Sequence, residues 1–224
     1  MIQHKQQTTI PHTGESGFTI IESLIAMLVA SVLLVSIAPV IVLGTATRVQ
    51  ARRIELGTQA ARTYIDGVRT GVISAPATTS SGTTLNASDP PTVGSLTCDA
   101  NAYCTVPATP ASNLYCIDGD GSGGCTVGNS KDLLIQAFRY NTASSSATAG
   151  YQLGVRVYRA DGFRSDGSLK KAPSKQATFT GGMGDRKAPL VEMTTAINPQ
   201  TNSFNDLCNR LKNVSNAASN SSCN

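Results

Sequence analysis

The sequence predicts an α+β fold in which one long N-terminal helix packs against a small antiparallel β-sheet, with loops stapled by disulfides. Three observations carry this prediction. An uncharged apolar run covers residues 23–47, a helical repeat of apolar residues follows it, and two segments in the second half alternate between apolar and polar residues. With 224 residues, the chain is long enough for one domain with appendages.

The apolar run is long enough to cross a membrane. It contains 25 residues without a charge. At about 1.5 Å per residue, a helix of that length exceeds the roughly 30 Å hydrocarbon core of a bilayer. The run is too long for the apolar core of a signal peptide, and no small-residue cleavage site follows it. Pro39 lies inside the run, where a membrane helix tolerates a kink.

Glu22 places a carboxylate at the start of this run. One interpretation puts it near the helix end, with its side chain reaching the headgroups. The other makes it functional, because a carboxylate inside a membrane costs on the order of a few kcal/mol and needs a positive partner. No Lys or Arg lies within helical reach on its C-terminal side. A new α-amino group, made by cutting the chain just before the run, would serve as the positive partner of Glu22.

The segment "GFTIIESLIAM", which begins at Gly17, resembles the prepilin peptidase signature of type IV pilins and type II secretion pseudopilins. The resemblance implies a leader peptide over residues 1–17, cleavage after Gly17 and N-methylation of Phe18. It also implies that Glu22 pairs with the N-terminal ammonium of a neighbouring filament subunit, and that Pro39 is a helix kink. Such a desolvated pair would fix the register between neighbours, since either charge alone is penalised.

We expect the helix to continue beyond the membrane, as it does in pilins. The transmembrane half would cover residues 18–47 and an amphipathic half residues 48–73. In the second half, apolar positions recur at steps of four and three residues: Ile54, Thr58, Ala61, Ile65, Val68 and Val72. Gly71 and Pro76 mark the expected end.

Residues 74–132 form the next predicted part, a long cysteine-containing loop. Turn-forming residues dominate it, and we expect a surface loop that lacks the apolar content for a core of its own. In pilins, the segment between helix and sheet is the variable region.

The chain has six cysteines, and an even number in a chain with a membrane segment indicates disulfides in an oxidising compartment. Short loops favour the pairs Cys98–Cys104, Cys116–Cys125 and Cys208–Cys223, although other pairings stay open. A zinc site is the weaker interpretation, because no C-x-x-C motif occurs.

An antiparallel β-sheet is expected over residues 133–197. Residues 133–140 and 151–160 alternate well and predict a hairpin with a longish loop. Shorter candidates are 176–180 and 189–197. The polar tail over 198–224 is expected to be a C-terminal disulfide loop, which resembles the one bordering the head of many pilins.

The stretch "CIDGDGSGGC" is the stronger of two candidate calcium sites; the weaker is Asp161 with Asp166, since Asp-Gly pairs are ordinary turns. The stretch places Asp118 and Asp120 two residues apart among glycines, and calcium is bound by alternating carboxylates in tight loops. The loop has no terminal glutamate, so it is not a complete EF-hand. A disulfide-closed turn explains the stretch as well. We therefore expect no cofactor apart from a possible structural calcium, which some pseudopilins carry.

A run of cations between residues 156 and 187 has two interpretations: a solvated sheet face, or a patch for an anionic polymer such as a polysaccharide. Its members are Arg156, Arg159, Arg164, Lys170, Lys171, Lys175, Arg186 and Lys187.

Enzyme activity is not expected. Both histidines, His4 and His12, precede the implied cleavage point, so the mature chain would have none. Histidine-dependent nucleophilic catalysis and histidine-ligated metals are thereby disfavoured. No Gly-Lys pair occurs, which argues against a Walker A loop. A separate assembly ATPase would have to supply the energy for filament assembly.

The resemblance therefore implies a minor pilin or pseudopilin, a structural subunit of a filament. Its partners would be other subunits, the prepilin peptidase, an assembly platform and the ATPase. It would cross the inner membrane once, with a cytoplasmic N-terminus and a periplasmic C-terminal domain, before joining a periplasmic or extracellular filament. The positive-inside rule predicts the reverse orientation, because Arg48, Arg52 and Arg53 follow the helix. Long domains can translocate despite such charges.

The system that uses the subunit has three candidate interpretations. Residues 133–197, with "GYQLGVRVYRADGF" and "FTGGMGDRKAPLVEMTT", resemble cyanobacterial hormogonium polysaccharide secretion pseudopilins. This resemblance implies polysaccharide secretion and gliding motility. The first alternative is a minor pilin of a surface type IV pilus that serves twitching, adhesion or DNA uptake. The second is a membrane-anchored binding module that does not polymerise.

Overall fold

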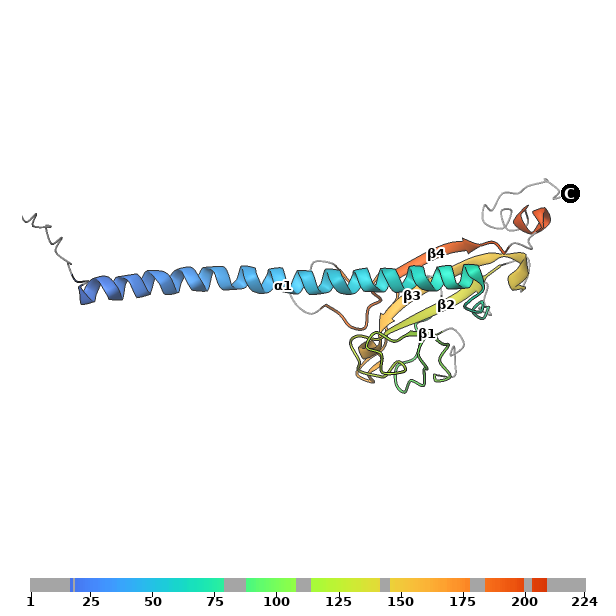
Figure 1. Cartoon of the computed structure of the whole chain (residues 1–224), viewed down its shortest axis with the longest axis horizontal. Helices are drawn as coiled ribbons and strands as arrows, with labels where there is room; N and C mark the ends of the chain where they lie inside the picture. The colour runs from blue at the N-terminus through green and yellow to red at the C-terminus, as the bar shows by residue number, and fades with distance from the viewer. Residues whose placement is uncertain are drawn as a thin grey trace, which may run out of the picture. The chain divides into compact units, whose positions relative to one another are not determined.

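A computed structural model describes residue 17 and residues 19–78, 88–107, 114–141, 146–177, 184–199 and 203–208. It divides the chain into two compact units, Met1–Gly44 and Thr45–Asn224, which we describe separately. The named elements are α1 (Ile20–Thr70), β1 (Leu114–Ile117), β2 (Leu133–Tyr140), η2 (Ala147–Ala149), β3 (Tyr151–Arg159), η3 (Ala160–Phe163) and β4 (Val191–Ile197) (Figure 1). The predicted layout of one long helix and a small antiparallel sheet is confirmed.

The first unit is the apolar part of α1. The Thr19 hydroxyl accepts a hydrogen bond from the Glu22 N–H at 3.3 Å and caps the helix N-terminus. The side chains from Ile20 to Leu43 are exposed, and none of the most apolar stretch is buried within the chain. Serine hydroxyls along it donate to carbonyls three residues earlier, at 2.7 to 2.8 Å. This part is long and apolar enough to cross a membrane.

In the second unit, α1 is amphipathic and packs on the sheet. Its buried residues are Gln50, Gly57, Ala60, Ala61, Tyr64, Ile65 and Val68. The helix ends at Thr70, so the predicted end at residue 73 was three residues too late. Gly71 stops it with a φ of 77°, a left-handed conformation that favours glycine, and the Ile73 N–H donates back to the Gly67 carbonyl at 3.0 Å.

The four strands form one sheet in the order β1-β2-β3-β4, and each neighbouring pair is antiparallel. The predicted hairpin is confirmed as β2 and β3, and the predicted segment 189–197 contains β4, which begins at Val191. The predicted strand 176–180 is not supported, because residues 176 and 177 have no strand structure; residues 178–180 lie outside the described part. Strand β1 was not predicted.

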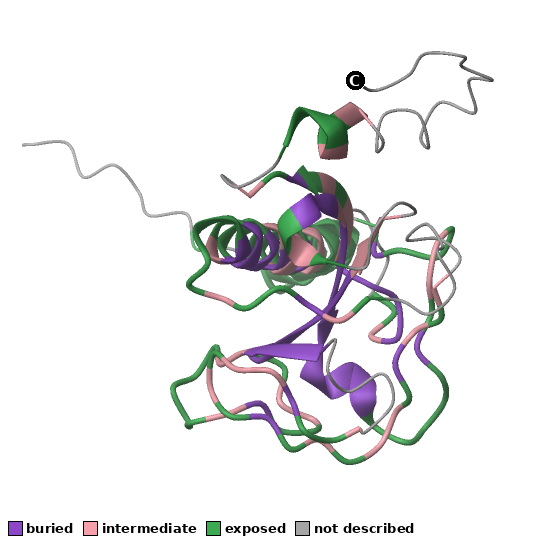
Figure 2. Ribbon diagram, turned by 90° about the vertical axis from the view of Figure 1, so that its right-hand side faces the viewer, coloured by how far each residue is buried: buried purple, intermediate pink, exposed green. Residues whose placement is uncertain are grey.

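The sheet is buried on both faces, and Figure 2 shows its ribbon mostly in the colour of buried residues. Successive apolar side chains of β2 and β3 point to opposite faces, so each face has its own apolar core. Leu133 and Ile135 face α1, whereas Leu134 between them faces the cysteine-containing segment. The α1 side also contains Tyr64, Tyr115, Ala137, Leu153, Val155 and Val157. The opposite side contains Cys98, Cys104, Leu114, Cys116, Cys125, Tyr158 and Phe163.

The apolar core on the side of the sheet opposite α1 corrects the prediction for residues 74–132. We expected a surface loop without a core, but its cysteines and Leu114 are buried against the back of the sheet. The disulfides Cys98–Cys104 and Cys116–Cys125 lie within this core, and both local pairings are as predicted. Cys208 is also disulfide-bonded, whereas its predicted partner Cys223 lies outside the described residues. The cystines therefore act as core residues as well as staples.

Candidate functional site

Glu22 lies in the first turn of α1, with an exposed side chain. Gly17 is exposed, and Phe18 lies outside the described residues. A first-turn carboxylate is favoured by the partial positive charge of a helix N-terminus, and Thr-x-x-Glu is the sequence of a capping box. Within the described part of the chain, Glu22 makes no ion pair. Its position thus suits either a helix-end residue or a carboxylate that awaits a cation from another molecule.

Pro39 lies inside α1, which is a single helix from Ile20 to Thr70. Proline has no N–H, so the carbonyl of Val35 loses its usual intrahelical donor. The helix continues through this position, and a kink at Pro39 stays a prediction.

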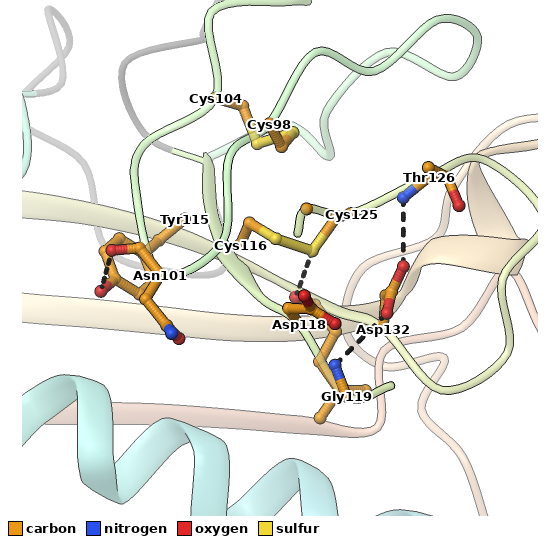
Figure 3. The surroundings of a disulfide bond; sticks show 12 residues. Cys98, Asn101, Cys104, Tyr115, Cys116, Asp118, Gly119, Cys125, Thr126 and Asp132 are labelled. Atoms are coloured by element: carbon orange, nitrogen blue, oxygen red, sulfur yellow. Dashed lines mark hydrogen bonds between the residues drawn. A yellow bond between two sulfur atoms is a disulfide. The ribbon is translucent and has the colours of Figure 1, made fainter. Parts of the chain in front are cut away.

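The predicted metal residues, Asp118 and Asp120, lie with a third carboxylate that the sequence did not single out, Asp132. Ligand atoms of the three lie within 4.8 Å of one another. Asp132 is buried directly before β2 and accepts hydrogen bonds from the N–H groups of Gly119 and Thr126, at 3.3 and 3.1 Å (Figure 3). Chain reversal at the Cys116–Cys125 disulfide brings these segments together.

Every carboxylate oxygen in this cluster accepts a hydrogen bond from a protein N–H group. Asp118, for example, accepts from Gly121 at 2.7 Å and from Gly123 at 2.8 Å. The Asn129 amide, followed by Ser122, lowers the pKa of Asp120 to about 2. These bonds account for the cluster as the anchor of a glycine-rich turn. They point to no cation, and calcium stays a prediction.

The cation run does not form a continuous exposed patch. Arg156, Arg159 and Lys187 are buried, with 0%, 6% and 8% exposure, so they cannot face a polymer. Six of the eight cations have a carboxylate partner: Arg156–Glu192, Arg159–Asp161, Lys170–Asp185, Lys171–Asp89, Arg186–Asp166 and Lys187–Asp166. The interpretation of this run as one polymer-binding surface is therefore wrong for its buried members.

A tyrosine cluster joins α1 to the first disulfide loop. The Tyr64 and Tyr103 hydroxyls lie 2.7 Å apart, and Tyr103 donates to the Ser74 carbonyl at 2.8 Å, so Tyr64 donates to Tyr103. Both rings pack against Tyr115, with centroid distances of 5.1 and 5.3 Å. Burial raises the pKa of Tyr64 and raises that of Tyr103 to about 12. Both phenols are therefore neutral donors at neutral pH.

A pocket of about 400 Å³ lies within the second unit. Arg53 from α1, Lys131 before β2 and Arg159 at the end of β3 contribute its charged side chains. Sequence patterns did not predict this pocket, because its lining residues come from segments as far apart as Arg53 and Leu190. No known protein family, characterised protein or solved structure matches this chain.

Proposed function

We propose that the chain is a minor pilin or pseudopilin, a structural subunit that assembles into a filament through its N-terminal helix. The observation that carries the proposal is the apolar part of α1. Its large side chains are exposed around the helix, and a single carboxylate, Glu22, lies in its first turn. A helix that is apolar all round must be covered by lipid or by other helices.

The second unit, which would form the head of the subunit, supports the same proposal. The amphipathic part of α1 packs on an antiparallel sheet, as expected for a subunit that displays a folded domain at the end of an assembly helix. The segment from Gly17 to Glu22 has the residues that a prepilin peptidase signature requires. Cleavage after Gly17 would create an ammonium at Phe18, the positive partner that Glu22 lacks within the described chain.

The proposed life cycle begins with one pass through the inner membrane, with the N-terminus in the cytoplasm and the head in the periplasm. The prepilin peptidase then trims and N-methylates the chain, and an assembly platform with a separate ATPase adds it to the filament. The subunit itself does no catalysis. The disulfides in the head are consistent with an oxidising compartment.

Polysaccharide secretion that supports gliding motility is the proposed system, on the resemblance carried by residues 133–197. A surface pilus for twitching, adhesion or DNA uptake is the alternative. Loss of the gene separates the two. Under the proposal, extracellular polysaccharide disappears while surface pili remain, whereas loss of the pili would favour the alternative.

Filament incorporation of a Glu22→Ala variant tests the proposal at the level of the subunit. The variant should be present in membranes at the wild-type level but missing from the sheared filament fraction. Glu55→Ala is the matched control, because Glu55 is an exposed carboxylate on the same helix but lies in the second unit. Normal incorporation of Glu22→Ala would contradict the proposal and favour a membrane-anchored binding module.

A further inference from the structure

Two exposed arginines follow the uncharged apolar run of α1. Arg48 is the first charged residue after the run, and Arg52 lies four residues later, so the two side chains emerge on the same face of the helix. Neither makes an ion pair within the described part of the chain. The sequence has no carboxylate between Glu22 and Glu55. This turn of α1 therefore carries positive charge that no residue of the same turn neutralises.

A third exposed cation, Lys175, comes from a distant segment. The Gln50 amide donates a hydrogen bond to the Gln176 side chain at 2.6 Å, and both side chains are buried. Lys175 directly precedes Gln176, so this contact holds its backbone close to the turn of α1 with the two arginines. Lys175 has no ion pair among the described residues, and the carboxylate of Asp185, whose carbonyl accepts from Gln176, is taken by Lys170 at 2.6 Å. Arg48, Arg52 and Lys175 are called the juxtamembrane cluster below.

The length of the uncharged run gives the depth of this cluster relative to a bilayer. The 25 residues of the run extend about 37 Å as a helix, whereas the hydrocarbon core is roughly 30 Å thick and the bilayer with its headgroups about 40–45 Å. Arg48 then lies at the edge of the hydrocarbon, and Arg52, about 6 Å further along the helix, lies at the level of the headgroups. Val49 between them is 51% exposed, which suits a position at this edge.

We propose that the juxtamembrane cluster binds the anionic headgroups of phospholipids in the leaflet on the side of the second unit. A guanidinium can donate two parallel hydrogen bonds to a phosphate, and basic residues next to a membrane-spanning helix attract anionic lipids. The inference rests on the membrane-spanning helix of the proposed function, but not on leader cleavage or filament assembly. It also assigns a role to Arg48 and Arg52, which the positive-inside rule counts against the proposed orientation.

The test measures lipid selectivity at the surface of the full-length protein in bilayers, with its disulfides intact. Electron spin resonance of spin-labelled phosphatidylglycerol and phosphatidylcholine gives their relative association with the protein at a single copy per nanodisc. We expect an about fivefold preference for phosphatidylglycerol at low salt, which decreases at about 0.5 M salt because the charges are screened. Equal association of the two lipids would overturn the proposal. If the arginine variants below then reduced self-association in crowded bilayers, the cluster would be assigned to contact with a second copy of the chain instead.

Variants locate the binding. Replacing both arginines, Arg48→Gln with Arg52→Gln, should reduce the preference to less than about twofold, whereas the charge-conserving pair Arg48→Lys with Arg52→Lys should keep most of it. Arg62→Gln is the matched control for Arg52→Gln, because Arg62 is also exposed and makes no ion pair within the described residues. It lies ten residues, or about 15 Å, further along the helix, which exceeds the screening length of about 8 Å.

We expect Arg52→Gln to lower the preference about twofold and Arg62→Gln to leave it unchanged. Equal losses in these two variants would overturn the cluster, because net charge alone would then account for the preference. Near-ultraviolet circular dichroism identical to that of the wild type checks that each variant is folded. None of these outcomes depends on the N-terminal peptide, which tests leader cleavage separately.

Discussion

Replacing Glu192 with alanine is expected to destabilise the second unit by about 3 kcal/mol, because it removes the carboxylate that pairs with a buried guanidinium. Arg156 in β3 is 0% exposed, and its Nε donates to Glu192 Oε1 at 2.5 Å. Its Nη1 donates to the Gln136 side chain at 2.8 Å and to the Ser88 carbonyl at 3.3 Å. These neutral acceptors remain in the variant, but neither carries a negative charge.

The magnitude follows from the burial of the pair. Breaking a buried ion pair from one side costs about 3–5 kcal/mol, and the Glu192 side chain is 11% exposed, so we take the lower end of that range. Total stabilities of about 5–15 kcal/mol make this a large loss. A double variant, Arg156→Met with Glu192→Leu, removes both charges and should be more stable than Glu192→Ala alone.

Urea unfolding of the full-length protein in detergent micelles measures the effect, with near-ultraviolet circular dichroism of the tyrosines as the signal. The matched control is Asp66→Ala, which removes an exposed i,i+3 pair with Arg69 at 3.7 Å and should change stability by less than about 0.5 kcal/mol. A Glu192→Ala midpoint equal to that of the Asp66→Ala control would refute the argument. So would a double variant that is less stable than Glu192→Ala.

Three further predictions concern the core, the aspartate loop and the tyrosines. Gly154→Val should cost about 1–3 kcal/mol in the same unfolding assay, because a Cβ there lies 2.5 Å from the Phe138 ring; a wild-type midpoint would contradict this. Asn129→Ala should raise the pKa of Asp120 from about 2 toward 3.8 in an NMR titration, and an unchanged value would disprove the assigned cause. Burial raises the pKa of Tyr103 to about 12, so its contribution to stability is fully present below pH 10.0 and is lost as the pH rises through 12. Tyr103→Phe should therefore lose less stability than the wild type between pH 10.0 and 12, and an equal loss in the two proteins would contradict this role of Tyr103.

Local patterns predicted the parts of the fold that depend on neighbours in sequence. The helical repeat over residues 48–73 and the alternation in 133–140 are properties of single segments, and both elements formed. The pairing Cys98–Cys104 followed from a short loop. Strand β1 was missed because its four residues, starting at Leu114, lie among turn formers, and it forms through pairing with β2.

Covering both faces of the sheet was the main feature that the sequence did not reveal. Both interpretations of the cation run placed Arg156 on an exposed surface, but the cysteine-containing segment covers that face of the sheet and buries it. The burial depends on contacts such as the one from Arg156 to Ser88, across 68 positions of sequence. Asp132 and the pocket beside Arg53 were missed for the same reason, since each is assembled from separate segments.

The N-terminal peptide of the protein recovered from its native membrane tests the central claim most directly. Mass spectrometry of this peptide reports both cleavage and methylation. We predict a mature chain that starts at Phe18 and carries one added methyl group, which would give Glu22 its ammonium partner in a neighbouring subunit. A chain that starts at Met1 would leave Glu22 without that partner and would contradict assembly as a pilin.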